Sequence, residues 1–190
     1  IGEKLGEFKR TGNRKDYSIE PHEQTLLDIA KANGKKVTSI GKISDIFAGK
    51  GISKSIKSST LPNLGNDTIK AIKEELDSSI IFTNFVDFDS EYGHRRDVKG
   101  YKEALEYFDS RLPEIMANLK DDDMLIITAD HGCDPTWKGS DHTREHVPFL
   151  AYNKYFTTKN IGKRETFSDL GQSIANYLEL PPLKHGKSFL

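Results

Sequence analysis

The sequence predicts an α/β fold with a mostly parallel sheet. Short apolar runs of strand length alternate along the chain with segments whose apolar residues recur at helical spacing. A helix, a tight turn at Asn33-Gly34 and a strand follow one another directly, which is the order of a parallel α/β unit. The run Leu125–Ile127 is uniformly apolar, as a strand covered on both faces requires, and it leads into Asp130 and His131. Because ligands of such sheets bind outside the carboxyl ends of the strands, we expect functional residues there.

The composition excludes several classes of protein. A length of 190 residues fits one domain, and a net charge of −1 gives no support for binding nucleic acid or an anionic membrane. No apolar run has the length of a membrane span, and no signal peptide is visible. The single cysteine, Cys133, excludes an internal disulfide framework and favours a reducing compartment. We therefore expect a cytoplasmic protein.

The other elements are predicted in chain order from apolar periodicity and turn residues. Polar residues 1–20 are expected to form a hinge or loop, and residues 53–66, rich in Ser and Lys, a mobile loop or long connection. Pro113 should kink or divide one long helix, and Pro148 should place the last strand near a sheet edge or make it begin late. Helices are expected at 25–32, 68–76, 98–119 and 169–178, and strands at 37–40, 80–86 and 147–152.

Two strand ends and one loop supply a set of candidate metal ligands. The predicted strand 80–86 leads into an acidic segment with one His, the strand at 125 ends in an Asp-His pair, and a further His follows. Mixed oxygen and imidazole ligands suit Mn²⁺, Zn²⁺ or Fe, and two clusters suit a pair of metals. The residues are Asp89, His94, Asp130, His131 and His142.

Counting ligands indicates that this set is incomplete. Asp89, His94 and His142 could serve one ion, but Asp130 and His131 would leave a second ion one ligand short. No Ser or Thr stands out as an activated nucleophile, and the sheet lacks an opening strand. We therefore expect a further acid and the nucleophile on a segment outside this chain.

Simpler interpretations stand beside the metal hypothesis. An Asp-His pair on a loop is often structural, with the His bound to a carbonyl group or water. His146 is four residues after His142, but Pro148 follows at once, so His142 alone is favoured as a ligand. Cys133 could be a thiolate nucleophile only with a base at a defined distance. Lys42, which follows a predicted strand, is either a phosphate contact or a surface lysine.

Several segments resemble one known family. Residues 128–145 (TADHGCDPTWKGSDHTRE) and 85–97 (FVDFDSEYGHRRD) resemble the metal-binding segments of the phosphopentomutases, in the alkaline phosphatase superfamily, and residues 40–49 and 186–190 match as well. The similarity covers nearly the whole chain. It implies an alkaline phosphatase-like three-layer sandwich that lacks its amino-terminal strand or strands. Residues 1–20 would then be a hinge or the end of a cap domain, and residues 21–190 the metal-binding core.

The resemblance also implies a reaction and its cofactors. The family consists of isomerases that interconvert ribose 1-phosphate and ribose 5-phosphate, and the deoxyribose equivalents, in nucleoside salvage. Two Mn²⁺ ions are implied, one held by Asp89, His94 and His142, the other by Asp130 and His131. An Asp near the family's amino terminus completes the second site, and a phosphorylated Thr in the family's first part is the nucleophile. Neither is in this chain, so the chain alone is expected to be inactive.

The resemblance further implies substrate contacts and leaves alternatives. Arg10 would be a contact of the cap to the substrate phosphate, and Lys42 a contact from the core. One alternative is a phosphotransferase similar to cofactor-independent phosphoglycerate mutase, although residues 92–96 argue against it because that family has a different pattern after its Gly-His. The other is a non-catalytic metal-binding module that has kept the ligands and lost the nucleophile.

Overall fold

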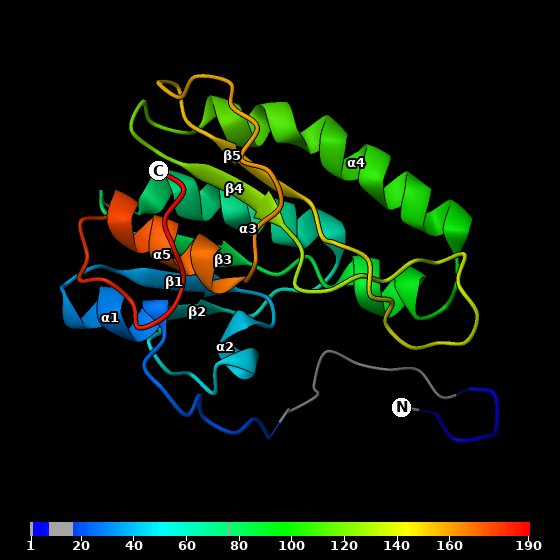
Figure 1. Cartoon of the computed structure of the whole chain (residues 1–190). Helices are drawn as coiled ribbons and strands as arrows, with labels where there is room; N and C mark the ends of the chain where they lie inside the picture. Colours follow the sequence, from blue (N-terminus) through cyan, green and yellow to red (C-terminus); the bar gives the residue numbers. More distant parts are fainter. Residues whose placement is uncertain (1, 8–16, 76) are drawn as a thin grey trace.

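A three-stranded parallel sheet forms the centre of the protein, seen here in a computed structural model that describes residues 2–7, 17–75 and 77–190 (Figure 1). The strand order is β2-β1-β3. Every residue of β1 is buried because this strand lies between its two neighbours and under helices. The strands are β1 (Val37–Ile40), β2 (Lys54–Ile56) and β3 (Ile80–Thr83).

Helices cover both faces of this sheet (Figure 1). Successive side chains of a strand point to opposite faces. Val37 accordingly packs in a cluster with residues of α1 (Leu26–Ala32) and α5 (Ser168–Tyr177), whereas Ile40 packs with residues of α3 (Leu61–Glu74). The long helix α4 (Val98–Ala117) packs against α3, further from the sheet.

A second sheet follows, and it corrects one expectation. Strands β4 (Leu125–Thr128) and β5 (Phe149–Tyr152) pair only with each other among the described residues, and they are antiparallel. The run Leu125–Ile127 is half-buried rather than covered on both faces, because β4 has a strand neighbour on one side only. The fold is thus a mixed α/β fold with a small parallel sheet. The start of β5 at Phe149, directly after Pro148, agrees with the prediction that this strand begins late.

The prediction of a mobile loop or long connection over residues 53–66 is wrong. This segment contains β2 and the first residues of α3, which begins at Leu61 with Pro62 in its first turn. Leu61 and Leu64 are buried at helical spacing, but the Ser-rich and Lys-rich composition before them hides this short apolar pattern. The strand β2 was missed because it has three residues and lies at the sheet edge.

Two further elements complete the path of the chain. A short helix α2 (Ile43–Ile46) follows β1, and a single turn of π-helix, η1 (Phe88–Gly93), follows β3. Helix α4 passes through Pro113 without dividing, contrary to one of the predicted outcomes. Among the described residues, no helix is long and apolar enough to cross a membrane. Leu76, the last residue of one predicted helix, lies outside the described residues.

Candidate metal centre

The first half of the site is built on the π-helical turn η1 after β3. Its amide hydrogen bonds include the one that His94 N donates to Asp89 O at 2.9 Å, five residues back. A π-turn holds one more residue than an α-turn and is frequent at functional sites. Here it brings Asp89 and His94 to the same place, with Nε2 of His94 lying 3.3 Å from Oδ1 of Asp89.

The second half of the site is the segment between β4 and β5. An isolated bridge pairs Gly132 with Thr143, and the Thr143 amide donates to Gly132 O at 3.2 Å. The residues next to this bridge are His131 and His142, and the bridge therefore brings them together although eleven positions separate them. Their rings stack with centroids 3.6 Å apart and planes inclined by 17°.

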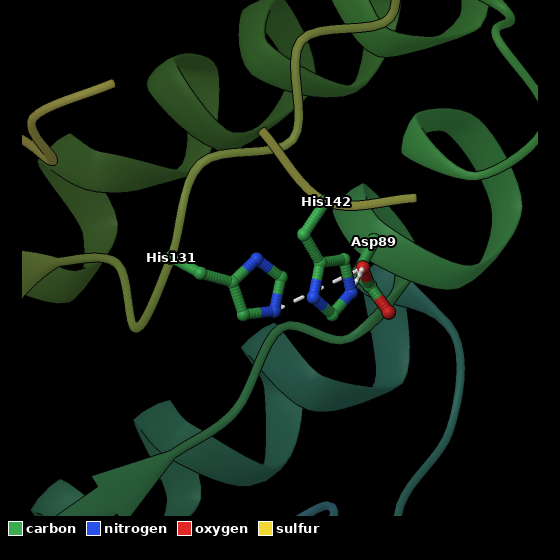
Figure 2. Close-up of side chains that lie close together, drawn as sticks. All are labelled: Asp89, His131 and His142. Atoms are coloured by element: carbon green, nitrogen blue, oxygen red, sulfur yellow. Dashed lines mark ion pairs between the residues drawn. The ribbon is translucent and has the colours of Figure 1, made fainter. Parts of the chain in front are cut away.

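Three of these side chains form a compact group (Figure 2). One ligand atom from each of Asp89, His131 and His142 lies within 4.8 Å of the others, and this is the candidate metal site found among the described residues. Nε2 of His142 is 3.1 Å from Oδ1 of Asp89, and Nε2 of His131 is 4.0 Å from the same oxygen. Both rings point their Nε2 edge toward the carboxylate (Figure 2).

The other two predicted ligands border this group. Nε2 of His94 lies 3.1 Å from Nε2 of His142, and Oδ2 of Asp130 lies 3.6 Å from Nε2 of His131. The side chain of Asp130 is 70% exposed, so the apolar strand before it does not bury this carboxylate. The structure thus places all five predicted ligands in one neighbourhood.

The donor atoms fit a divalent cation. Oδ1 of Asp89 is buried and accepts no hydrogen bond, although imidazole nitrogens surround it. Two ligands of one ion, each bound at about 2.1 Å, lie roughly 3.0–3.4 Å apart. The pairs that join Asp89, His94 and His142 measure 3.1, 3.1 and 3.3 Å between ligand atoms. A cation would satisfy the orphaned oxygen and the imidazole lone pairs together.

Cys133 lies beside the site, and its environment does not favour a thiolate. Burial raises the pKa of its thiol, and the neighbouring Asp89 carboxylate raises it further. The thiolate is the nucleophilic form, so this direction argues against Cys133 as a nucleophile. Its sulfur packs against Gly93, where a Cβ would approach Sγ to 2.4 Å.

We also considered three further residues from the sequence, namely Lys42, Arg10 and His146. Lys42 follows Gly41 at the carboxyl end of β1 and is half-buried at the start of α2. Arg10 lies outside the described residues. His146 is exposed, four residues after His142 and before β5 begins.

Sequence reasoning missed the contacts by which two side chains support the site. Arg96 binds carbonyl groups on both halves, and Asp87 accepts a hydrogen bond from the Leu61 amide at 2.6 Å. Both lie in the segment 85–97 that was singled out for its ligands. The residue pattern does not indicate these contacts, because most of the partners are backbone groups distant in sequence.

The fold and the site define a class of protein that comparison with known sequences identifies. A family model described as the metalloenzyme superfamily matches residues 4–182, and the chain belongs to that superfamily.

Individual relatives are more specific. The chain is 57% identical to a phosphopentomutase of Aeromonas salmonicida (strain A449) over 190 residues, which are 100% of this chain and 47% of the relative. It is 57% identical to a phosphopentomutase of Shewanella sp. (strain ANA-3) over 97% of this chain and 46% of the relative. A phosphopentomutase of Shewanella pealeana is 56% identical over 100% and 47%, respectively. The chain thus spans about half the length of the curated relatives that it matches.

Proposed function

We propose that this chain is the metal-binding part of a phosphopentomutase, an isomerase that interconverts ribose 1-phosphate and ribose 5-phosphate and the deoxyribose equivalents. The observation that carries the proposal is the grouping of Asp89, His131 and His142 in a chain 57% identical to phosphopentomutases. Pentose phosphates are metabolites of the cytoplasm, and we place the protein there.

We propose two Mn²⁺ ions as the cofactors. The separations of 3.1–3.3 Å among the ligand atoms of Asp89, His94 and His142 support a first site shared by these residues. Asp130 and His131, 3.6 Å apart, are the proposed part of a second site. Such ions, when bound, would neutralise charge on a transferring phosphoryl group. The imidazole and carboxylate groups would fix the positions of the ions relative to the phosphoryl group, because these side chains are held by the backbone of η1 and of the loop after β4.

Two predicted substrate contacts remain part of the proposal. Lys42 would meet a phosphate from the core, at the carboxyl end of β1, where ligands of parallel sheets bind. Arg10 would do so from residues 1–20, the proposed hinge or end of a cap domain.

We also propose that one strand from outside this chain lies between β3 and β4 and unites the two sheets. Each of these strands has a single strand neighbour among the described residues, and the segments that follow them meet at the metal site. The half of the relatives that this chain does not match is the proposed source of the strand, of the nucleophile and of the missing ligand. Amide exchange of residues 80–83 and 125–128 should be slower in the longer polypeptide than in this chain.

The test uses a polypeptide that extends this chain to the full length of its relatives, supplied with Mn²⁺. Ribose 1-phosphate and 3-phosphoglycerate are offered in parallel, and each isomerisation is followed. We expect turnover of the pentose phosphate alone. Turnover of the glycerate, or of neither compound, would refute the proposed function. The 190-residue chain by itself should turn over neither.

A matched pair of variants links this activity to the site. His142→Ala removes a ligand atom that lies 3.1 Å from Oδ1 of Asp89, whereas His146→Ala removes an exposed imidazole of the same segment. We expect the first variant to lose turnover by at least about a hundredfold and the second to keep it. Equal losses in both would indicate that the segment, not the ligand, is responsible.

A further inference from the structure

One guanidinium group connects the two halves of the candidate metal centre. Arg96, two residues after His94, donates hydrogen bonds to four backbone carbonyl oxygens. Nη1 binds Gly93 O and Asp134 O, each at 3.0 Å. Nε binds Gly139 O at 2.5 Å, and Nη2 binds Asp141 O at 2.6 Å. The planar fork of donors of an arginine can bind several acceptors at once in a fixed arrangement.

Two of the four acceptors directly precede metal-ligand candidates. Gly93 directly precedes His94, and Asp141 directly precedes His142. Between Gly139 and Asp141 lies Ser140, whose carbonyl oxygen is bound by Nδ1 of His94. Three consecutive carbonyl groups of the loop are therefore held by Arg96 and His94 together.

This arrangement sets the tautomer of His94. A carbonyl oxygen only accepts hydrogen bonds, so Nδ1 of His94 must carry the proton in this contact. The lone pair of the neutral ring is then on Nε2, which faces Oδ1 of Asp89 at 3.3 Å. A hydrogen bond from the second ring nitrogen is the usual way in which a metal-binding histidine is oriented.

The backbone of Arg96 is itself in an uncommon conformation. Its φ of 53° lies in the left-handed region, which is unfavourable for a residue with a side chain. Such conformations persist where the surrounding structure holds them, and they gather at functional sites. Here the conformation accompanies the four hydrogen bonds of the side chain.

We propose that Arg96 is a positioning residue of the metal centre, which holds the loop of residues 134–141 against η1 so that His94 and His142 converge on Asp89. The proposal rests on the proposed function in one respect, namely that these side chains bind a divalent cation. It does not require the identity of the substrate.

The charge of Arg96 and its hydrogen bonds predict opposite effects on metal affinity when this residue is replaced. A positive charge near a cation site repels the cation, so removing it should by Coulomb's law strengthen binding. Loss of the four carbonyl contacts should weaken binding, because the loop that carries His142 would no longer be fixed. Arg96→Gln removes both the charge and the fork, and Arg96→Lys keeps the charge but cannot bind four carbonyl groups.

The experiment measures the affinity of the 190-residue chain for Mn²⁺ alone, by calorimetry and by the electron paramagnetic resonance signal of free Mn²⁺. We expect both Arg96→Gln and Arg96→Lys to bind roughly 10- to 100-fold more weakly than the unaltered chain, as outer contacts of metal ligands typically do. The control Arg95→Gln removes the same charge from an exposed ion pair with Glu91, at 2.8 Å, and should change the affinity less than about threefold. Unchanged or tighter binding by Arg96→Gln, or full affinity in Arg96→Lys, would overturn the proposal.

A gentler variant covers the case in which Arg96 replacements fail to fold. Gly139 has φ +74°, and a Cβ at this position would meet nothing within 4 Å. Gly139→Ala should therefore strain the backbone of the loop that carries the carbonyl groups without causing a steric clash. Gly162 has φ +66° and equally open space in a different loop, and Gly162→Ala is the matched control. We expect weaker Mn²⁺ binding only in Gly139→Ala. Equal affinities in these two variants would contradict the positioning role of the loop.

A measurement on the metal-free chain tests the role of Arg96 independently of the proposed function. In the metal-free chain, the amides of residues 139–143 should exchange at least about tenfold faster in Arg96→Gln than in Arg95→Gln, because the loop opens more often. Equal exchange in the two variants would overturn the role of Arg96, whatever the chain binds. If the unaltered chain binds no Mn²⁺ but the exchange differs as expected, the metal function fails and the positioning of the loop by Arg96 stands.

Discussion

Gly93 lies where the two halves of the site approach each other closely. A Cβ at this position would lie 2.4 Å from Sγ of Cys133 and 2.9 Å from Phe88 O. Cys133 is itself two residues after His131, so the contact joins η1 to the segment after β4. The absence of a side chain at Gly93 therefore allows η1 to lie this close to the segment after β4.

We expect Gly93→Ala to lower the free energy of unfolding by about 1–3 kcal/mol, as overpacking of a close contact does. The additional change Cys133→Ala removes the Sγ atom and should restore part of this loss. Urea unfolding of the two single variants and the double variant measures both effects. If the changes in the two single variants simply added up to the change in the double variant, the two residues would not interact in this way.

Gly65 is a useful comparison because a methyl group added at this position would meet no close neighbour. It lies inside α3, and a Cβ there meets only Nη1 of Arg111, at 3.9 Å. Gly65→Ala should raise the free energy of unfolding by about 0.5–1 kcal/mol, because alanine restricts the unfolded chain and favours the helix. A loss of stability in the same urea experiment would contradict this view of α3.

At the scale of elements, η1 is connected to the start of α3. Oδ2 of Asp87 accepts from the amide of Leu61 at 2.6 Å, and Leu61 is buried. The preceding residue, Thr60, has a φ of 72°, which is unfavourable for a β-branched side chain. The beginning of α3 and the turn that carries Asp89 are thus fixed to each other.

Asp87→Ala should therefore affect both stability and metal binding. We expect a loss of about 1–3 kcal/mol in the free energy of unfolding, since a buried amide loses its acceptor, together with weaker Mn²⁺ binding. Asp87→Asn keeps an acceptor oxygen and should lose less. The control Thr25→Ala removes an N-cap of α1, where Thr25 Oγ1 accepts from the Asp28 amide, and should lower stability without changing Mn²⁺ affinity. Thermal unfolding and calorimetry give the two quantities, and an unchanged Mn²⁺ affinity in Asp87→Ala would contradict the coupling.

Local sequence patterns were sufficient to predict most of the elements. The apolar spacing predicted α1, β1, β3, α4 and α5 to within a few residues. The pairing of β4 and β5 was not predictable in this way, because a strand pattern says little about which edge a strand joins. The segment before α3 was missed because β2 is short and two of its three residues, Lys54 and Ser55, are polar.

The sequence was sufficient to predict the candidate ligands of the site, but not the contacts that hold these ligands in place. Carboxylates and imidazoles after strand ends mark ligand candidates, so Asp89, His131 and His142 were named from the sequence. The stacking of His131 on His142 depends on the Gly132–Thr143 bridge, a long-range backbone contact that no local pattern encodes.

At the scale of the whole molecule, Asp169 ties the end of the chain to the core. Its carboxylate accepts from the Lys187 amide and from Nε of Arg164, each at 2.9 Å, and the residue is 5% exposed. Gly186 makes this path possible, because it has φ +95° and passes so close to Ser168 O that a Cβ would lie 2.2 Å from it. The tail from residue 186 thus packs over the start of α5.

This anchor should make stability depend on pH. The hydrogen bond from the Lys187 amide and the Arg164 guanidinium lower the pKa of Asp169 in the folded protein. A lowered folded-state pKa stabilises the protein above the unfolded-state value of about 3.9, and this contribution is lost as the pH falls through the folded-state value. Asp169→Asn should therefore lower the Tm by several degrees at pH 7, and the difference should shrink below about pH 4.

The matched control is Asp109→Asn, on the exposed surface of α4, which should leave the Tm nearly unchanged at both pH values. A difference between Asp169→Asn and the unaltered chain that stayed constant from pH 7 to pH 3 would show that the charge of Asp169 is not responsible.

Asp89, His94 and His142 are proposed to bind a divalent metal, and anomalous diffraction tests this most directly. Crystals of the 190-residue chain grown with Mn²⁺ would be measured at the manganese absorption edge. We predict an anomalous peak bounded by Oδ1 of Asp89 and Nε2 of His94 and His142, within about 2.3 Å of at least two of these atoms. No peak at this position, or a peak held by other residues, would contradict the account.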